Sequence, residues 1–347
     1  MKKIILLGLL FLCHTHIRAT VFSVSNDPNG GAQYNTLVAA YNAAANGDTL
    51  YLEGTDIDYQ ISDVSNPWSK ALVVVGIGIR PAKSSLRRTK ITGIGNGLFF
   101  MNAAGSGSRF YGLQFQTPNS FSGIISQVVY ENCEFLANYE FSNIDFNNFS
   151  FRNCWFTHLN LGGGSYYNAM FSSCIFNGFI NGASNGFVSN IILDHCLFLS
   201  TGTLTSGLKN TTISNSIFMN CSYLGSFTNC FILNNIARLP NLFPPSGTAV
   251  TFGGNIDNTD PMLVNCPINT GFSSNDPRDY HLLPGSPCIG AGTVGSDIGP
   301  HGSLTKFSET GEVLFTPIMR TLLINNTTVV PNGTLNVHIY STKPNDH

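Results

Sequence analysis

The amino-acid sequence predicts an all-β fold in which the chain winds through stacked coils of short strands. Residues of the same kind recur about every twenty positions along most of the chain. Apolar and polar residues alternate on both sides of each recurrence, and charged residues make up only 10% of the 347 residues. A fixed period of this length is typical of solenoids, because each repeat buries its apolar face only against its neighbours. The alternation indicates strands as the building blocks of each repeat.

The first repeated feature is a column at intervals of 19 to 22 residues, formed by Ile94, Leu113, Cys133, Cys154, Cys174, Cys196, Ser216, Ile236 and Ile256. The position before it holds small or polar residues, namely Gly93, Gly112, Asn132, Asn153, Ser173, His195, Asn215, Asn235 and Asn255. Glycine and asparagine tolerate the left-handed backbone that a sharp bend needs. The sequence therefore predicts an asparagine ladder, with one corner between two strands of every coil.

Two further columns are apolar throughout. Two positions after the central column stand Phe115, Phe135, Phe156, Phe176, Phe198 and Phe218. Three positions before it stand Ile91, Phe110, Tyr130, Phe151, Phe171, Leu193, Ile213 and Leu233. With the strand period of two, all three columns point to the inside, and coils about 4.8 Å apart stack equivalent side chains on one another. This arrangement is a parallel β-helix of about ten coils.

The two ends of the sequence differ from the repeat. Residues 1–19 have the organisation of a signal peptide, with a basic start and an apolar stretch from Ile4 to Leu12, and cleavage is expected after Ala19. Residues 20–302 would then form the β-helix, with a short helix within residues 34–45 that caps its open end. The buried face of this helix is predicted to be Leu37, Ala40, Tyr41 and Ala44. Residues 303–347 are predicted to form a C-terminal β-appendage or the start of a further module. No segment after the signal is long enough to span a bilayer, so we expect no transmembrane segment after signal removal.

Two segments resemble a known superfamily. The first is NTLVAAYNAAANGDTLYLEG at 35–54, and the second comprises DPMLVN at 260–265 and RDYHLLPGSPCIGAGTVGSDIG at 278–299. They resemble the opening and closing coils of secreted right-handed parallel β-helix proteins of the pectate-lyase-like superfamily, and with the coils between them the resemblance covers roughly residues 21 to 302. It implies a right-handed β-helix that is secreted or lies at an extracellular surface, and a bacterial source. It does not imply one activity, because the superfamily includes polysaccharide lyases, glycoside hydrolases and adhesins.

The nine cysteines of this exported chain would ordinarily suggest disulfide bonds. Four of them stand in the central inward column: Cys133, Cys154, Cys174 and Cys196. A cysteine there behaves as a small buried hydrophobe, and parallel side chains of neighbouring coils do not reach disulfide geometry. A ladder also does not converge on a metal ion. The sequence predicts free, stacked thiols and no metal site, and it leaves two pairs that a disulfide could join, Cys221 with Cys230 and Cys266 with Cys288.

Charged residues are few in the central coils, and the formal net charge of -2 disfavours nucleic acid as a partner. The candidates for catalysis are Asp145, Arg152, Asp194, His195 and Lys209. The resemblance implies that a lyase would hold Ca²⁺ with clustered carboxylates and would use an Arg or Lys as the base. The strand spacing places Asp145 and Lys209 about 14 Å apart. Asp194 and His195 flank a bend and are expected to point in different directions, so no assembled active site is predicted.

One outward position is unusually apolar. Directly after the central column, four consecutive coils carry Trp155, Ile175, Leu197 and Ile217. Water disfavours such a row unless something covers it. One cover is the C-terminal segment of the chain itself, whose apolar residues are Val313, Leu314, Phe315, Ile318, Leu322, Leu323 and Ile324. The other is a partner protein or a glycan stacked on Trp155, in which case the row is the binding site.

The sequence therefore favours a secreted, non-catalytic β-helix scaffold that acts in cell-surface adhesion or glycan contact, with a polysaccharide or cell-surface partner and no cofactor. The alternative is a carbohydrate-active enzyme, a polysaccharide lyase or glycoside hydrolase that acts on acidic polysaccharide. The enzyme requires several carboxylates that converge in a groove, whereas the binder requires an uncovered row at Trp155.

Overall fold

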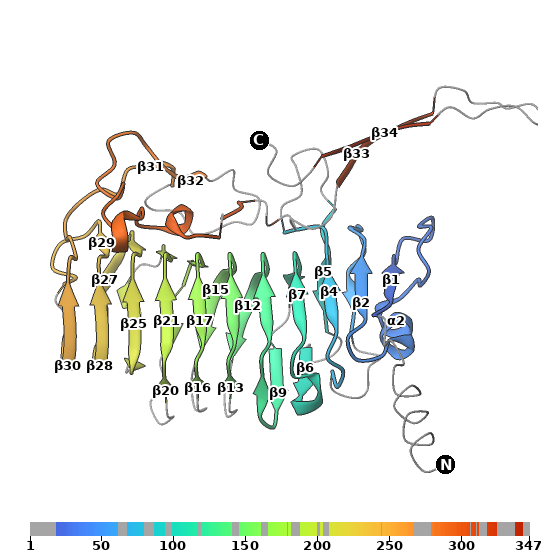
Figure 1. Ribbon diagram of the computed structural model, residues 1–347, viewed down its shortest axis with the longest axis horizontal. Coiled ribbons are helices and arrows are strands. Elements are labelled where there is room, and N and C mark those ends of the chain that lie inside the picture. The colour runs from blue at the N-terminus through green and yellow to red at the C-terminus, as the bar shows by residue number, and fades with distance from the viewer. Residues whose placement is uncertain are drawn as a thin grey trace, which may run out of the picture.

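The computed structural model describes residues 19–342 except 62–67, 80–86, 94–98, 117–118, 141–145, 161–165, 179, 182–187, 200–201, 204–207, 244, 267–278, 306, 310, 312–317 and 325–336. Its strands stack side by side along the long axis of the molecule, as Figure 1 shows. Neighbouring strands in the long sheets are parallel. The predicted parallel β-helix is therefore confirmed.

Each coil contributes strands to as many as three sheets. The first sheet has twelve strands: β1 (Val21–Val24), β2 (Thr49–Leu52), β4 (Val73–Val75), β7 (Arg109–Tyr111), β11 (Val129–Glu131), β14 (Ser150–Arg152), β17 (Met170–Ser172), β21 (Ile191–Asp194), β24 (Leu208–Lys209), β25 (Thr211–Ser214), β28 (Ser226–Leu233) and β30 (Ser246–Gly253). The second sheet has ten: β3 (Tyr59–Gln60), β5 (Lys90–Thr92), β8 (Gln114–Phe115), β12 (Glu134–Glu140), β15 (Trp155–Asn160), β18 (Ile175–Phe176), β19 (Ile180–Asn181), β22 (Leu197–Phe198), β26 (Ile217–Phe218) and β29 (Ile236–Ala237). The third has four: β10 (Ile125–Ser126), β13 (Phe146–Asn147), β16 (Tyr166–Tyr167) and β20 (Val188–Ser189).

Shorter elements complete the described structure. Four two-stranded sheets pair β6 (Phe99–Asn102) with β9 (Asn119–Ser122), β23 (Gly202–Thr203) with β27 (Cys221–Tyr223), β31 (Leu263–Asn265) with β32 (Asp279–Leu282), and β33 (Ile318–Ile324) with β34 (Val337–Thr342). The helical elements are α2 (Leu37–Ala43), η1 (Ala103–Gly105), η2 (Thr293–Gly295) and η3 (Pro300–Gly302). None of the helices in the described part of the chain has the length and apolar character needed to cross a membrane.

Aromatic rings fill the solenoid in two ladders. In the second sheet the stacked rings are Phe115, Phe135, Phe156, Phe176, Phe198 and Phe218, with neighbouring centroids 4.6 to 5.2 Å apart. In the first sheet they are Phe110, Tyr130, Phe151 and Phe171, with spacings of 4.8 to 5.1 Å. The ladders meet edge to face, as between Tyr130 and Phe135 at an interplanar angle of 75°. Both geometries are favourable for aromatic pairs, so the predicted inward columns also pack in low-energy contacts.

The predicted corner ladder is confirmed over the central coils. Its residues Asn132, Asn153, Ser173, His195 and Asn215 have left-handed φ values of 50° to 54°. A second ladder, which the sequence analysis missed, precedes the strands of the first sheet. It consists of Asn148, Asn168, Asn190, Asn210 and Asn229, with φ values of 49° to 57°. Its spacing was readable in the sequence, because these asparagines also recur about every twenty residues.

The column assignment is wrong at both ends of the solenoid. Ile91 pairs with Phe115 in the second sheet, so Thr89 rather than Ile94 occupies the central column. Ile94 itself lies outside the described residues. Ile236 pairs with Ile217, which moves Asn235 into the central column. The reason is that the repeat length changes at both ends: 24 residues separate Thr89 from Leu113, and 19 separate Ser216 from Asn235. A column of similar apolar residues does not reveal such changes.

Asn235 remains stable inside because its amide is fully used. Its side chain donates to the Ile213 carbonyl at 3.0 Å and to Asn255 Oδ1 at 2.9 Å, and its Oδ1 accepts from the Ser216 amide at 2.9 Å. A buried amide without such partners would cost several kcal/mol, whereas a satisfied one is tolerated.

The four stacked cysteines are free and fully buried, as predicted. Their thiols donate to backbone carbonyls, for example Cys133 to Phe110 at 3.4 Å and Cys154 to Tyr130 at 3.4 Å. Burial raises the pKa of both thiols. The two pairs outside the column, Cys221 with Cys230 and Cys266 with Cys288, are also free thiols.

The N-terminal cap is also confirmed. Helix α2 lies at the end of the solenoid beside β1 and β2 (Figure 1), and Leu37, Ala40, Tyr41 and Ala44 are buried as predicted. Thr36 begins the helix, and its hydroxyl accepts a hydrogen bond from the Ala39 amide at 3.2 Å. Tyr41 packs on Trp68 with the ring centroids 4.6 Å apart, which ties the helix to the core.

Candidate functional site

The outward row proposed as a binding site is covered by the chain itself. Trp155, Ile175, Leu197 and Ile217 are each at most 1% exposed. They form a second apolar core with the closing segment, which we define as residues 279–311 and which contributes Tyr280, Cys288, Ile298 and Phe307. A glycan could not reach a row buried in this way, so the prediction that these four residues bind a partner is wrong.

Among the described residues, the cover comes from Tyr280, Cys288, Ile298 and Phe307 of the closing segment. Phe307 stacks on Trp155 at 6.1 Å and Tyr280 packs on it at 5.6 Å. Of the apolar residues expected to form the cover, Val313, Leu314 and Phe315 lie outside the described residues. Strand β33 pairs with β34 in an antiparallel hairpin. Because Phe307 belongs to the core over Trp155, the predicted boundary at residue 302 does not end the packed solenoid.

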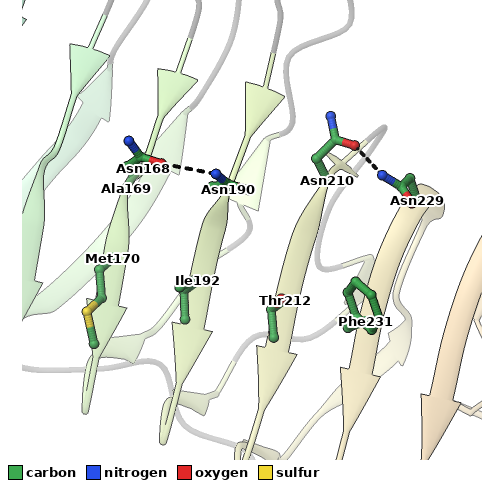
Figure 2. A pocket seen from close by; sticks show the side chains of 9 residues that line it. All are labelled: Asn168, Ala169, Met170, Asn190, Ile192, Asn210, Thr212, Asn229 and Phe231. Atoms are coloured by element: carbon green, nitrogen blue, oxygen red, sulfur yellow. Dashed lines mark hydrogen bonds between the residues drawn. The ribbon is translucent and has the colours of Figure 1, made fainter.

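The outward face of the first sheet is open. Met170, Ile192, Thr212 and Phe231 follow one another in register across β17, β21, β25 and β28. The apolar side chains Met170, Ile192 and Phe231 are 37%, 39% and 46% exposed. Together with the asparagine corners they line a hollow of about 570 Å³, which Figure 2 shows from close by.

Asparagine amides border this hollow along the second corner ladder. Asn190 donates to Asn168 at 3.1 Å, and Asn229 donates to Asn210 at 2.6 Å. Figure 2 shows these side chains at one end of the strands, above the row that begins at Met170. All four are exposed, so a ligand can reach their amides.

A second hollow, of about 870 Å³, continues the first, because both are lined by Met170 and Ile192. We refer to the two together as the groove. The far wall of the second hollow is made by residues 293–296 and 302–305 of the closing segment. Asn215 holds this wall in place: its Oδ1 accepts from the Thr293 amide at 2.8 Å, and its carbonyl accepts from the Gly299 amide at 2.8 Å.

A short chain of hydrogen bonds lies in the second hollow. His195 Nδ1 is 2.8 Å from Asp194 Oδ2, and His195 Nε2 is 3.3 Å from Ser296 Oγ. The expectation that Asp194 and His195 point in different directions is therefore wrong, because the left-handed backbone at His195 turns its ring back over the preceding carboxylate. Ser296 comes from a distant segment, and the sequence pattern gave no signal for it.

Asp194 is held in its ionised form. Burial opposes ionisation, but hydrogen bonds from His195, Ser214 and Asn215 outweigh it and lower the pKa of the carboxyl group. Ser214 and Asn215 both donate to Asp194 Oδ1, at 2.7 and 2.8 Å. A carboxylate fixed in this way orients the imidazole so that Nδ1 carries the proton and Nε2 is free to accept one.

The other catalytic candidates divide between the groove and the rest of the chain. Arg152 lines the second hollow with Asp194 and His195. Its register partner on the neighbouring strand is Glu131. Burial raises the pKa of Glu131, and the positive charge of Arg152 only partly offsets this rise. Lys209 lies on β24, before the Asn210 corner, and Asp145 lies outside the described residues. Among the described residues that line the groove, Asp194 is the one carboxylate.

Comparison with known proteins adds little to this picture. No family model matches the sequence, and no curated protein matches it. A similar solved structure is the pectin methylesterase from Aspergillus niger, with 12% sequence identity and a TM-score of 0.33. The alignment covers 73% of this chain and 91% of that one. A likeness at this level carries no argument about activity.

Proposed function

We propose that the protein is an extracellular, non-catalytic β-helix that binds a carbohydrate chain along the groove on the first sheet. The observation that carries the proposal is the continuity of the two hollows through Met170 and Ile192. This joins an exposed apolar row, a ladder of amides and a polar end into one surface. The signal-like residues 1–19 support the extracellular location.

The chemistry of the groove suits a sugar polymer. Sugar rings have apolar C–H faces, which can pack on Met170, Ile192 and Phe231, and hydroxyl groups, which can bond the asparagine amides beside them. Three large apolar side chains left exposed in one row favour an interaction surface, because a monomeric protein gains by burying them. Pocket walls of this kind, apolar with a few placed polar groups, are typical of ligand sites.

Calorimetric titration with a panel of neutral and acidic polysaccharides tests the proposal. We expect at least one to bind, and we expect Phe231→Ala to weaken it roughly tenfold, or about 1.4 kcal/mol. Tyr223→Ala is the matched control, because Tyr223 is 48% exposed, close to the 46% of Phe231, and does not line the groove. Absence of binding across the panel, or an equal effect of both substitutions, would contradict a carbohydrate groove.

A second candidate function is ester hydrolysis in the same groove, favoured by the Asp194, His195 and Ser296 chain. His195 Nε2 would take the proton of Ser296 as its Oγ attacks the acyl carbon, and Asp194 would stabilise the imidazolium that forms. The imidazolium would return the proton to the departing alcohol oxygen as the ester C–O bond breaks and an acyl-serine remains. Water, deprotonated by the same imidazole, would then release the acid and restore Ser296. The Oγ to Nε2 distance of 3.3 Å is within the looser range of ligand-free sites. A calcium-dependent lyase is supported less, because the described groove offers one carboxylate.

Incubation with acetylated and methyl-esterified polysaccharides, followed by titration of released acid, tests this second function. Ser296→Ala should lower any turnover by at least roughly 100-fold. Ser222→Ala, which changes an exposed serine that lines neither hollow, should leave it unchanged. Intact esters after incubation leave the non-catalytic binder as the better reading. A rise in ultraviolet absorbance from unsaturated sugar ends would instead favour the lyase.

A further inference from the structure

Three side chains of the types that bind metal ions lie close together in the closing segment, outside the groove. They are His281 on β32, His301 on η3 and Glu309 in the turn that follows, and their ligand atoms all lie within 4.8 Å of one another. His301 Nε2 is 2.7 Å from Glu309 Oε1, and His281 Nδ1 is 3.5 Å from the same oxygen. The two imidazole rings stack with their centroids 3.7 Å apart.

We propose that His281, His301 and Glu309 bind a divalent transition-metal ion of the zinc type, which fastens the closing segment over the covered row. The cysteine ladder of the sequence predicted no metal site. The histidines are 20 positions apart along the chain and the carboxylate 8 further on, with no short ligand motif, so only the fold brings them together.

The donor set suits zinc. Imidazole nitrogen and carboxylate oxygen are both zinc ligands, and bonds of 2.0 to 2.2 Å in a tetrahedron place neighbouring ligand atoms about 3.4 Å apart. The observed separations from Glu309 Oε1, 2.7 and 3.5 Å, bracket that value. Small side-chain movements are therefore enough to complete the site.

Asp279 lies beside the cluster but is not one of its three converging ligands. Its Oδ1 lies 2.7 Å from His281 Nδ1, the atom that would also face the metal. This nitrogen cannot donate a hydrogen bond to Asp279 and coordinate a metal at once, so an ion bound there replaces that hydrogen bond. The side chains of His281 and Asp279 are 57% and 43% exposed, which leaves a path for the ion to enter.

The position of the site explains what a bound ion would do. It joins β32 to the turn after η3, and the His301 and Phe307 rings pack edge to face with their centroids 5.2 Å apart. Phe307 in turn stacks on Trp155 in the covered row. Because the ligands come from separate parts of the closing segment, a metal bound only in the folded state stabilises the cover by mass action.

Titration of the purified, chelator-treated full chain with Zn²⁺ tests the proposal, with Co²⁺ as a spectroscopic probe of the ligand set. We expect one ion per chain, a higher melting temperature with Zn²⁺, and a visible Co²⁺ spectrum of tetrahedral nitrogen and oxygen ligands. His281→Gln and Glu309→Gln should each weaken binding roughly 100-fold.

Two controls separate this site from adventitious binding. Cys266→Ser changes a half-buried thiol, and Asp56→Asn changes an exposed carboxylate that is not part of the cluster; both should leave the affinity unchanged. No binding by the wild-type chain, or an affinity unchanged in His281→Gln, overturns the proposal. So does an affinity lost in Cys266→Ser. Because His281 is largely exposed, its substitution should leave folding intact, and circular dichroism of that variant verifies this.

Discussion

Two outward faces of the same solenoid carry rows of large apolar side chains in register, and they differ in what lies over them. On the second sheet, Trp155, Ile175 and Leu197 are at most 1% exposed, because the closing segment packs on them. On the first sheet, Met170 and Ile192 are 37% and 39% exposed. An apolar outward row therefore indicates either a covered seam or a recognition surface, and the row alone does not distinguish them.

The closing segment covers the row on the second sheet, and it can pack this closely because of a glycine. Gly299 has a φ of 107° and passes so close to Ile217 that a Cβ added there would lie 2.6 Å from Ile217 Cδ1. A glycine is needed at this approach, both for its backbone conformation and for the missing side chain. The segment then runs along the edge of the second hollow, so the same piece of chain closes one face and forms a wall of the groove on the other.

The largest expected effect comes from placing a charge on each face in turn. Ile175→Asp buries an unpaired carboxylate beneath the closing segment and should lower the free energy of unfolding by at least about 3 to 5 kcal/mol. Ile192→Asp is the matched change on the open face, where water solvates the charge, and it should cost about 0.5 kcal/mol or less. Urea unfolding of both variants measures the difference. Equal losses would mean that the two faces are covered alike.

A smaller effect is expected from removing one aromatic ring on each side. Phe307→Ala takes away the ring that stacks on Trp155 and should cost about 3 kcal/mol, since Phe307 is only 5% exposed. It should also shift tryptophan fluorescence towards the red, because water would reach Trp155. Phe231→Ala on the open row should change stability by less than about 1 kcal/mol. An unchanged fluorescence spectrum in Phe307→Ala would show that other residues suffice to cover Trp155.

Much of the fold could be predicted from the sequence because its determinants repeat. Each inward phenylalanine has an equivalent in the next coil, and stacked strands place equivalents in contact. Where the repeat length changed by one residue, at Asn235, the prediction failed. A polar residue in an inward column can be told from a corner only when its hydrogen-bond partners are known, and those belong to neighbouring coils.

The candidate site was less predictable, because its parts come from segments far apart in the chain. Ser296 meets His195 across about a hundred residues, and the cover over Trp155 comes from more distant residues still. Neither contact follows from the twenty-residue period. Arg152, Asp194 and His195 were identified as candidates because charged residues are scarce in the central coils, and these three do line one hollow.

The smallest expected effect concerns the pH dependence of stability. It arises at Asp194, which lines the second hollow together with the closing segment. The pKa of Asp194 is lower in the folded protein than in the unfolded chain, because hydrogen bonds from His195, Ser214 and Asn215 outweigh the effect of burial. Its contribution to stability is therefore present above the unfolded pKa of about 3.9 and is lost as the pH falls through the lower folded value.

Urea unfolding between about pH 2 and pH 6 should show this loss in the wild-type protein, and Asp194→Asn should flatten that part of the profile. Ser214→Ala, which removes one of the donors to Asp194 Oδ1, should flatten the profile less. Because Asp194 also fixes the imidazole that faces Ser296, the same variant should weaken any ester hydrolysis while leaving the stacking row at Phe231 able to bind. If Asp194→Asn instead keeps the full acid sensitivity of the wild-type protein, the network at the corner contributes nothing measurable to holding the closing segment in place.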